Sequence, residues 1–256
     1  MKKINPRKSL IVAFFVILAI SCQENEFQNE VQSTEIESTP LINLGQIKAY
    51  SFDGSEGDPI SLDTAKVWVK NNFDKNSQTK GHFVGGEILS KLLAQDGCMG
   101  IRFYYAIDEL GDLQILLKGA DVNGNDISGS IPTVKAILSS GDIIGGVETL
   151  DSKLGENITE KIYQDRTTNY TRKYSNTISA HFFGYQIINS ILSENGCVGI
   201  RMHLALNGTQ VPQLLLIGAD KNGKALLPTS SEMSRTKTDN TIADVSYPCP
   251  SYCSGT

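Results

Sequence analysis

The chain has 256 residues, a formal net charge of -5 at pH 7 and five cysteines. This acidic balance argues against nucleic acid as a partner, because binding to phosphates needs a cationic surface. The length that follows the N-terminal signal described next suffices for one or two small domains.

Residues 1–21 have the layout of an export signal. Cationic residues come first, an apolar run extends from Leu10 to Ile20, and Ser21 precedes Cys22. The run is too short to span a membrane. The stretch 18–22 resembles a bacterial lipobox, which implies cleavage before Cys22 and attachment of lipid (palmitate among the chains) to Cys22. Cleavage would remove four positive charges and no acid, so the formal net charge would fall from -5 to -9.

We therefore expect a lipoprotein of the cell envelope, held to the outer membrane by its lipid and facing the periplasm or the exterior. Each buried methylene of such an anchor contributes about 0.8 kcal/mol. Residues 22–57 are read as the lipidated cysteine and a disordered acidic tether, since residues 23–40 carry few bulky apolar side chains. An acidic segment in this place also resembles the surface-export signals of Bacteroidota lipoproteins.

An internal repeat is the main feature of the remaining chain. Residues 82–124 align without a gap to residues 181–223, with 19 identities in 43 positions. The string Gly-Cys-x-Gly-Ile-Arg at 97–102 recurs at 196–201. Two copies of one supersecondary unit are therefore expected.

Each copy is predicted to contain two helices followed by two or three strands. Ser61 and Thr159 are candidate N-caps of the first helix. A second helix is expected to include Val84 in copy one and Phe183 in copy two on its apolar face, with left-handed glycines, Gly97 and Gly196, at its end. From residues 101 and 200 the apolar period changes to two, which predicts strands joined by hairpin turns.

The fold class that follows is α+β, with antiparallel sheets and the two copies packed as a pseudo-twofold pair. The expected divisions are a repeat unit at 58–128, a linker at 129–156, a second unit at 157–227 and an irregular tail at 228–256. Residues 133–138 of the linker are a candidate strand.

Four cysteines besides Cys22 make disulfides possible in an exported protein, with three connectivities. Cys249 and Cys253 are spaced for a local bridge. Cys98 and Cys197 are expected to be small buried hydrophobes. The alternatives are a bridge between Cys98 and Cys197, or a zinc site with all four thiolates, which their spacing disfavours. No metal or cofactor is expected.

Two repeated polar sets are candidate ligand-binding or ion-pair residues. Arg102 and Arg201 point away from the apolar strand face and are grouped with Asp121 and Asp220, where an ion pair is favoured over an anion site. His82 and His181 are expected near helix starts, where a structural role outweighs that of a base or ligand.

The pattern of residues 61–66, 83–89, 97–104 and 119–124, with the tail Pro-Cys-Pro-x-x-Cys at 248–253, resembles a group of small Bacteroidota proteins that have one such unit. This chain resembles a tandem version with a single Cys-Pro tail. The resemblance implies a shared fold and lineage, and no activity, ligand or catalytic residue.

The sequence favours a non-catalytic binding module with an envelope or extracellular partner. A redox-active or metal-binding lipoprotein that uses the C-terminal cysteines is the alternative, and an enzyme built on the repeated His or Arg and Asp residues is a third reading. Motifs of hydrolases, metalloproteases and phosphate-binding loops do not occur in the sequence.

Overall fold

The computed structural model describes residues 51–76, 81–128, 132–175, 177–228, 240–244 and 246–249. The expected signal, Cys22, most of the tether and Cys253 lie outside the described residues. Within the described ranges, four helices and two six-stranded antiparallel sheets confirm the α+β class. No helix in these ranges is long and apolar enough to cross a membrane.

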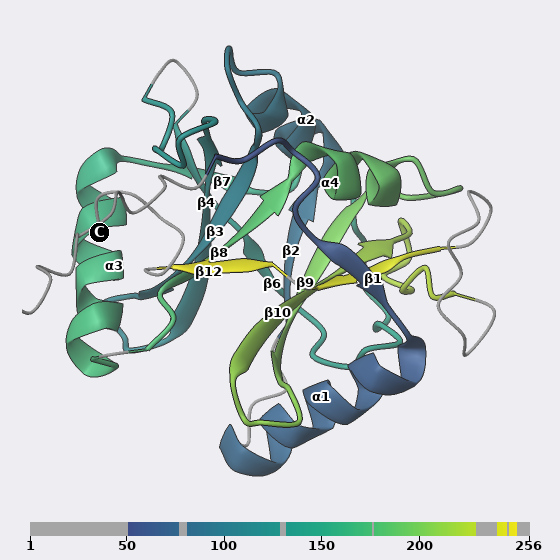
Figure 1. Cartoon of the computed structure of the whole chain (residues 1–256). Coiled ribbons are helices and arrows are strands. Elements are labelled where there is room, and N and C mark those ends of the chain that lie inside the picture. The colour runs from purple at the N-terminus through teal and green to yellow at the C-terminus, as the bar shows by residue number, and fades with distance from the viewer. Residues whose placement is uncertain are drawn as a thin grey trace, which may run out of the picture. The chain divides into compact units, whose positions relative to one another are not determined.

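The two halves of the chain contain the same elements in the same order (Figure 1). The first half has β1 (Asp58–Ile60), α1 (Leu62–Asn76), β2 (Gly81–Gly85), α2 (Gly86–Leu93), β3 (Gly100–Ile107), β4 (Leu113–Ala120), β5 (Thr133–Lys135) and β6 (Ile137–Ser139). The second half has β7 (Glu156–Ile158), α3 (Glu160–Lys173), β8 (Ala180–Gly184), α4 (Tyr185–Leu192), β9 (Gly199–Leu206), β10 (Pro212–Ala219), β11 (Ile242–Asp244) and β12 (Tyr247–Cys249).

Both sheets contain strands from both halves. Sheet A has the order β1-β11-β10-β9-β2-β6, and sheet B has the order β12-β8-β3-β4-β5-β7. The halves exchange a strand, because β2 pairs with β9 and β8 pairs with β3. The register repeats as well: Val84 lies opposite Ile200, and Phe183 lies opposite Ile101. Replacing every strand of sheet A by its counterpart in the other half gives sheet B.

Two helices cover the outer faces of the sheets, and two lie between the sheets (Figure 1). Ala65 and Trp68 of α1 pack on sheet A, whereas Ile162 and Tyr163 of α3 pack on sheet B. Helices α2 and α4 contact strands of both sheets. They bring Leu89, Leu92, Ile188 and Ile191 into the central core.

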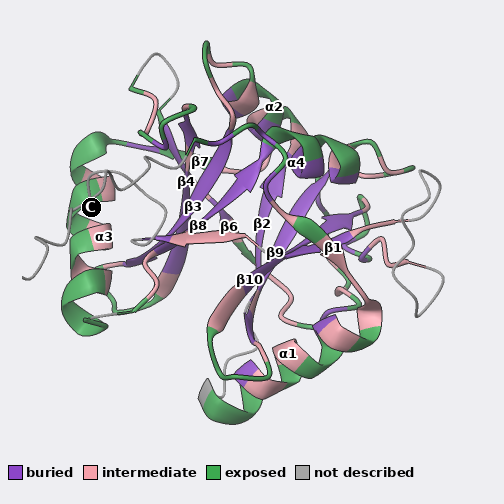
Figure 2. Cartoon of the chain, in the orientation of Figure 1, coloured by how far each residue is buried: buried purple, intermediate pink, exposed green. Residues whose placement is uncertain are grey.

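The central strands are buried on both faces, as Figure 2 shows. All eight residues of β3 are buried. Alternate side chains of this strand point to the inner face of the sheet, which is apolar, and to the outer face, which α3 covers. This explains why Arg102, on the outer face, is as inaccessible to solvent as Ile101 on the inner face.

The second helix begins later than the sequence suggests. Val84 and Phe183 were expected on helices but lie in the strands β2 and β8, all of whose residues are buried. A short apolar run without alternation fits a buried strand as well as a buried helix. Gly85, the last residue of β2, packs closely against the backbone of Ser152, because a Cβ at position 85 would lie 2.3 Å from that carbonyl.

The expected caps and turns are confirmed with one adjustment. Ser61 Oγ accepts a hydrogen bond from Thr64 N at 3.1 Å, and Thr159 Oγ1 accepts one from Ile162 N at 3.3 Å. Gly97 and Gly196 are left-handed, with φ of 72° and 81°. These glycines do not directly follow the helices as expected. The helices end at residues 93 and 192, and three residues separate each helix from its glycine.

Segments outside the expected repeat units also build the sheets. The bridging segment contributes β5 and β6, which include the candidate strand at 133–138, and the tail contributes β11 and β12 where irregular structure was expected.

Candidate functional site

Arg102 lies in a buried polar cluster under α3. Its Nη1 donates to Asp126 Oδ1 and to the hydroxyl of Tyr104, both at 2.9 Å, and its Nη2 donates to the carbonyl of Gly124. Tyr163 of α3 donates to the other carboxylate oxygen of Asp126 at 3.2 Å. The cluster therefore connects β3, the turn that follows β4, and α3.

Arg201 keeps the position but has other partners. Its Nε donates to Ser139 Oγ at 2.9 Å, and its Nη2 lies 3.1 Å from Glu148 Oε2. The counterpart of Asp126 in the second half is Ala225, so the carboxylate comes from the segment between the halves. Each arginine therefore forms an ion pair, but with Asp126 or Glu148 and not with the expected Asp121 or Asp220.

The expected partners of these arginines do something else. Asp121 Oδ1 accepts backbone hydrogen bonds from Asn123 and Asn125 at 2.9 and 2.8 Å. Asp220 repeats this with Asn222 and Lys224, both at 2.9 Å. These carboxylates hold tight turns and do not form the expected ion pairs with arginine.

The two repeated histidines are not at helix starts. His82 lies in β2 of sheet A, with Nε2 3.2 Å from the carbonyl of Leu113, and His181 lies in β8 of sheet B, with Nδ1 2.6 Å from Ser246 Oγ. Burial lowers the pKa of His181 to about 3, so its imidazole is neutral at pH 7. The two histidines therefore lie in different sheets and have different hydrogen-bond partners.

The cysteines of the repeated string are half-buried free thiols. Cys98 donates to the carbonyl of Gly100 at 3.1 Å, and Cys197 donates to that of Gly199 at 3.3 Å. Burial raises the pKa of both thiols, which keeps them protonated and poorly nucleophilic. Cys249 is buried and disulfide-bonded. Its expected partner, Cys253, lies outside the described residues, so that pairing stays a prediction.

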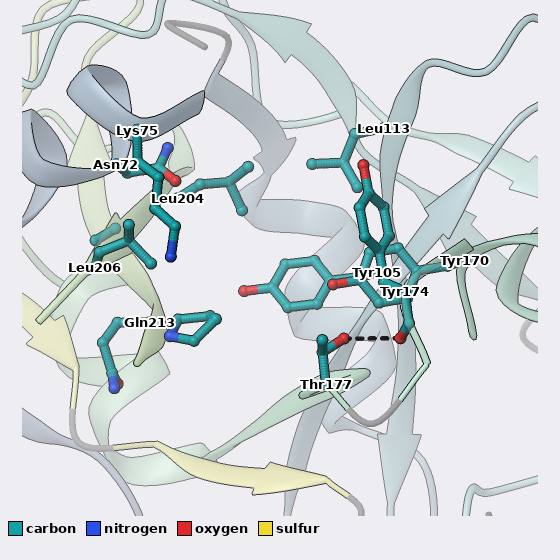
Figure 3. Close-up of a pocket in the computed structure, with 12 residues that line it drawn as sticks. Asn72, Lys75, Tyr105, Leu113, Tyr170, Tyr174, Thr177, Leu204, Leu206 and Gln213 are labelled. Atoms are coloured by element: carbon teal, nitrogen blue, oxygen red, sulfur yellow. Dashed lines mark hydrogen bonds between the residues drawn. The ribbon is translucent and has the colours of Figure 1, made fainter. Parts of the chain in front are cut away.

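A cavity of about 410 Å³ opens between the two sheets, at the end away from α2 and α4. Figure 3 shows tyrosines on one side of it and aliphatic and amide side chains on the other. The size is within the range of small-molecule sites. Its lining comes from both halves of the chain: Asn72, Lys75, Tyr105, Leu113, Tyr170, Tyr174, Thr177, Leu204, Ala205, Leu206, Pro212 and Gln213.

Aromatic rings form one wall of the cavity. The ring centroids of Tyr174 and Tyr170 are 5.0 Å apart, those of Tyr170 and Tyr105 are 5.4 Å apart, and the imidazole of His181 follows at 5.6 Å from Tyr105. The row starts at the exposed ring of Tyr174, directly after α3, and ends at the buried imidazole of His181. Such a wall offers flat apolar surface for a ligand.

Tyr105 contributes a polar atom that nothing in the described protein satisfies. Its side chain is 3% exposed, and its hydroxyl is buried without a hydrogen-bond partner. Burial raises the pKa of this hydroxyl well above its ordinary value, so it remains a donor. A buried polar group left unpaired costs about 1–3 kcal/mol.

The opposite wall is aliphatic, with polar groups around it. Leu204 and Leu206 of β9 face the tyrosines, while Asn72, Lys75 and Gln213 add amides and one ammonium (Figure 3). None of the residues that line the cavity is an Asp or Glu.

None of the residues that line the cavity was among the candidate site residues predicted from the sequence. The one available signal was a difference between the copies: Tyr105 corresponds to Leu204, although 19 of the 43 aligned positions are identical. In the described part of the chain, no group of three His, Cys, Asp or Glu residues is arranged to hold a metal ion.

Comparison with known proteins gives no relative from which a role could be carried over. No protein-family model, curated protein or solved structure matches this chain.

Proposed function

We propose that this chain is a non-catalytic, lipid-anchored envelope protein that binds a small, partly apolar ligand in the cavity between its sheets. The observation that carries the proposal is the buried, unpartnered hydroxyl of Tyr105 at the cavity. A ligand with a hydrogen-bond acceptor would satisfy that donor, while its body lies between the tyrosine wall and the leucines.

The proposal includes a pseudo-twofold relation between the copies. The exchange of β2 and β8, with equivalent register, supports it. So do matched contacts: Asn71 Nδ2 donates to the carbonyl of Leu206 at 3.2 Å, and Asn169 Nδ2 donates to that of Ile107 at 3.3 Å. In this arrangement the cavity lies at the junction of the copies.

The redox alternative has less support. The protonated, half-buried thiols of Cys98 and Cys197 are poor nucleophiles, and Cys249 is already in a disulfide.

A blocking variant tests the cavity. We expect 4-phenylbutyrate, 4-phenylbutyramide or 4-phenylbutylamine to bind the purified chain saturably at one site in calorimetric titrations. Leu204→Trp should abolish that binding by filling the cavity. Val147→Trp, at a fully exposed position, should leave it unchanged. Absence of binding by all three probes, or equal binding by Leu204→Trp with its fold verified by circular dichroism, would overturn the proposal.

The anchor is tested separately. Cys22→Ala should move the protein from the membrane fraction of its native cells to the soluble fraction, because the residue that would carry lipid is gone. An unchanged membrane fraction would contradict the anchor and leave the cavity proposal standing.

A further inference from the structure

Among the residues that line the cavity, the one charged side chain is a cation. The carboxyl of Asp244, which is buried and is not a lining residue, interacts electrostatically with the Tyr105 hydroxyl. Lys75, in the last turn of α1, is one of the lining residues, and no carboxylate lines the cavity. Asp74, next to Lys75 in the chain, is paired with Lys70.

A second cation stands beside the other wall. Lys173, the counterpart of Lys75 in α3, has its ammonium 5.4 Å from the ring centroid of Tyr174, which lines the cavity. The two outer helices therefore both end at the cavity, each with a lysine in its last turn. A lysine in the last turn of a helix interacts favourably with the helix dipole in any protein. The helix dipole does not explain why the residues that line the cavity include no acid.

We propose that the ligand is a small organic anion. This inference rests on the proposed function and specifies its ligand class: a carboxylate next to Lys75 at the edge of the cavity, an apolar or planar body along the tyrosine wall, and an acceptor that reaches Tyr105. The lining has donors for both ends of such a molecule, and none of its residues is an acid.

A cationic or neutral ligand fits less well. A cationic head would face Lys75 and Lys173 with no acid among the lining residues, and a neutral one would gain nothing from either ammonium. The aromatic rings alone attract cations, which makes charge preference the property to measure.

The test compares three probes that differ only in their end group: 4-phenylbutyrate, 4-phenylbutyramide and 4-phenylbutylamine. At low ionic strength we expect the carboxylate to bind about 2- to 5-fold more tightly than the amide, the range of an exposed charge pair. The amine should bind most weakly. The preference should shrink in 0.5 M NaCl because salt screens exposed charges.

Lys75→Gln should remove the preference by lowering the affinity for the carboxylate while leaving that for the amide unchanged. Lys66→Gln removes one charge from an exposed position of the same helix and is the matched control; it should retain the preference. Equal affinities for carboxylate and amide in the unmodified chain, or an equal loss for both in Lys75→Gln, would overturn the anion inference while binding at the cavity stands. Failure of all probes to bind, or binding that Leu204→Trp does not block, would instead overturn the proposed function.

Discussion

Tyr105 and Leu204 occupy equivalent positions in the two halves of the chain and line the same cavity from opposite sides. Both lie on inner strand faces, Tyr105 in sheet B and Leu204 in sheet A. The same position in the repeat therefore contributes an apolar side chain to one wall of the cavity and a hydroxyl without a hydrogen-bond partner to the other.

Tyr105→Phe should stabilise the empty protein and weaken ligand binding. Removal of an unpaired buried hydroxyl is expected to raise the free energy of unfolding by about 1 kcal/mol. Urea titration followed by the fluorescence of Trp68, the one tryptophan of the sequence, measures it. Tyr163→Phe is the control, since that hydroxyl donates to Asp126 and its loss should destabilise the protein without affecting binding. Loss of stability in Tyr105→Phe would show that the hydroxyl has a partner.

Asp126→Ala should be among the most damaging single changes. It leaves the guanidinium of Arg102, whose side chain is 2% exposed, without its carboxylate, and breaking a buried pair in this way costs about 3–5 kcal/mol. Asp74→Ala, which breaks an exposed pair with Lys70 one helical turn away, should cost less than about 0.5 kcal/mol. The same urea titration compares the two, and similar small losses would contradict a structural role for Arg102.

Stability should depend on pH through Glu194. Burial raises the pKa of its carboxyl to about 8 in the folded state, against an ordinary value of 4.5, and the hydrogen bond from Thr241 N only partly opposes this. Between about pH 4.5 and pH 8 the folded chain holds a proton that the unfolded chain has lost. The contribution is therefore full below this window, falls as pH rises through it, and is lost above it.

Glu194→Gln should flatten that part of the profile, and it introduces the residue that the first half already has at this position, Gln95. Urea midpoints measured from pH 4.5 to pH 9 should separate the variant from the unmodified chain most strongly at the alkaline end. Glu87→Gln, at an exposed position of α2, serves as the control. Parallel profiles for Glu194→Gln and the unmodified chain would rule out this carboxyl as the source.

The strand exchange makes a prediction about the halves. Residues 51–149 alone supply β2 but not β9, and β3 but not β8. We expect this piece to be either unfolded as a monomer or folded only as a dimer that restores the missing pairings. Size-exclusion chromatography with light scattering and circular dichroism distinguishes these states, and a folded monomer would contradict the exchange.

Local features were predictable because their causes are local. The caps Ser61 and Thr159, the left-handed Gly97 and Gly196 and the hairpins depend on a few neighbouring residues. The α+β class followed from the change of apolar period near Ile101.

Features that depend on distant segments were not predictable. A five-residue buried strand such as β2 has no period that separates it from the helix after it. The partner of Arg201 comes from the bridging segment, and the cavity is lined by side chains from α1, α3 and two hairpins. The spacing of residues within one half of the chain does not indicate which side chains of the other half will pack against it.

The divergence of paired positions has a consequence for how such a site could arise. A symmetric homodimer of one unit would place identical side chains on opposite sides of its twofold axis, so a site on that axis would accept a ligand equally in two orientations. Joining the units in one chain removes that restriction, because Tyr105 can change without Leu204, and Tyr170 without Asn72. Under the proposed pseudo-twofold relation, duplication followed by independent substitution is thus sufficient to turn a symmetric interface into a cavity whose two sides differ.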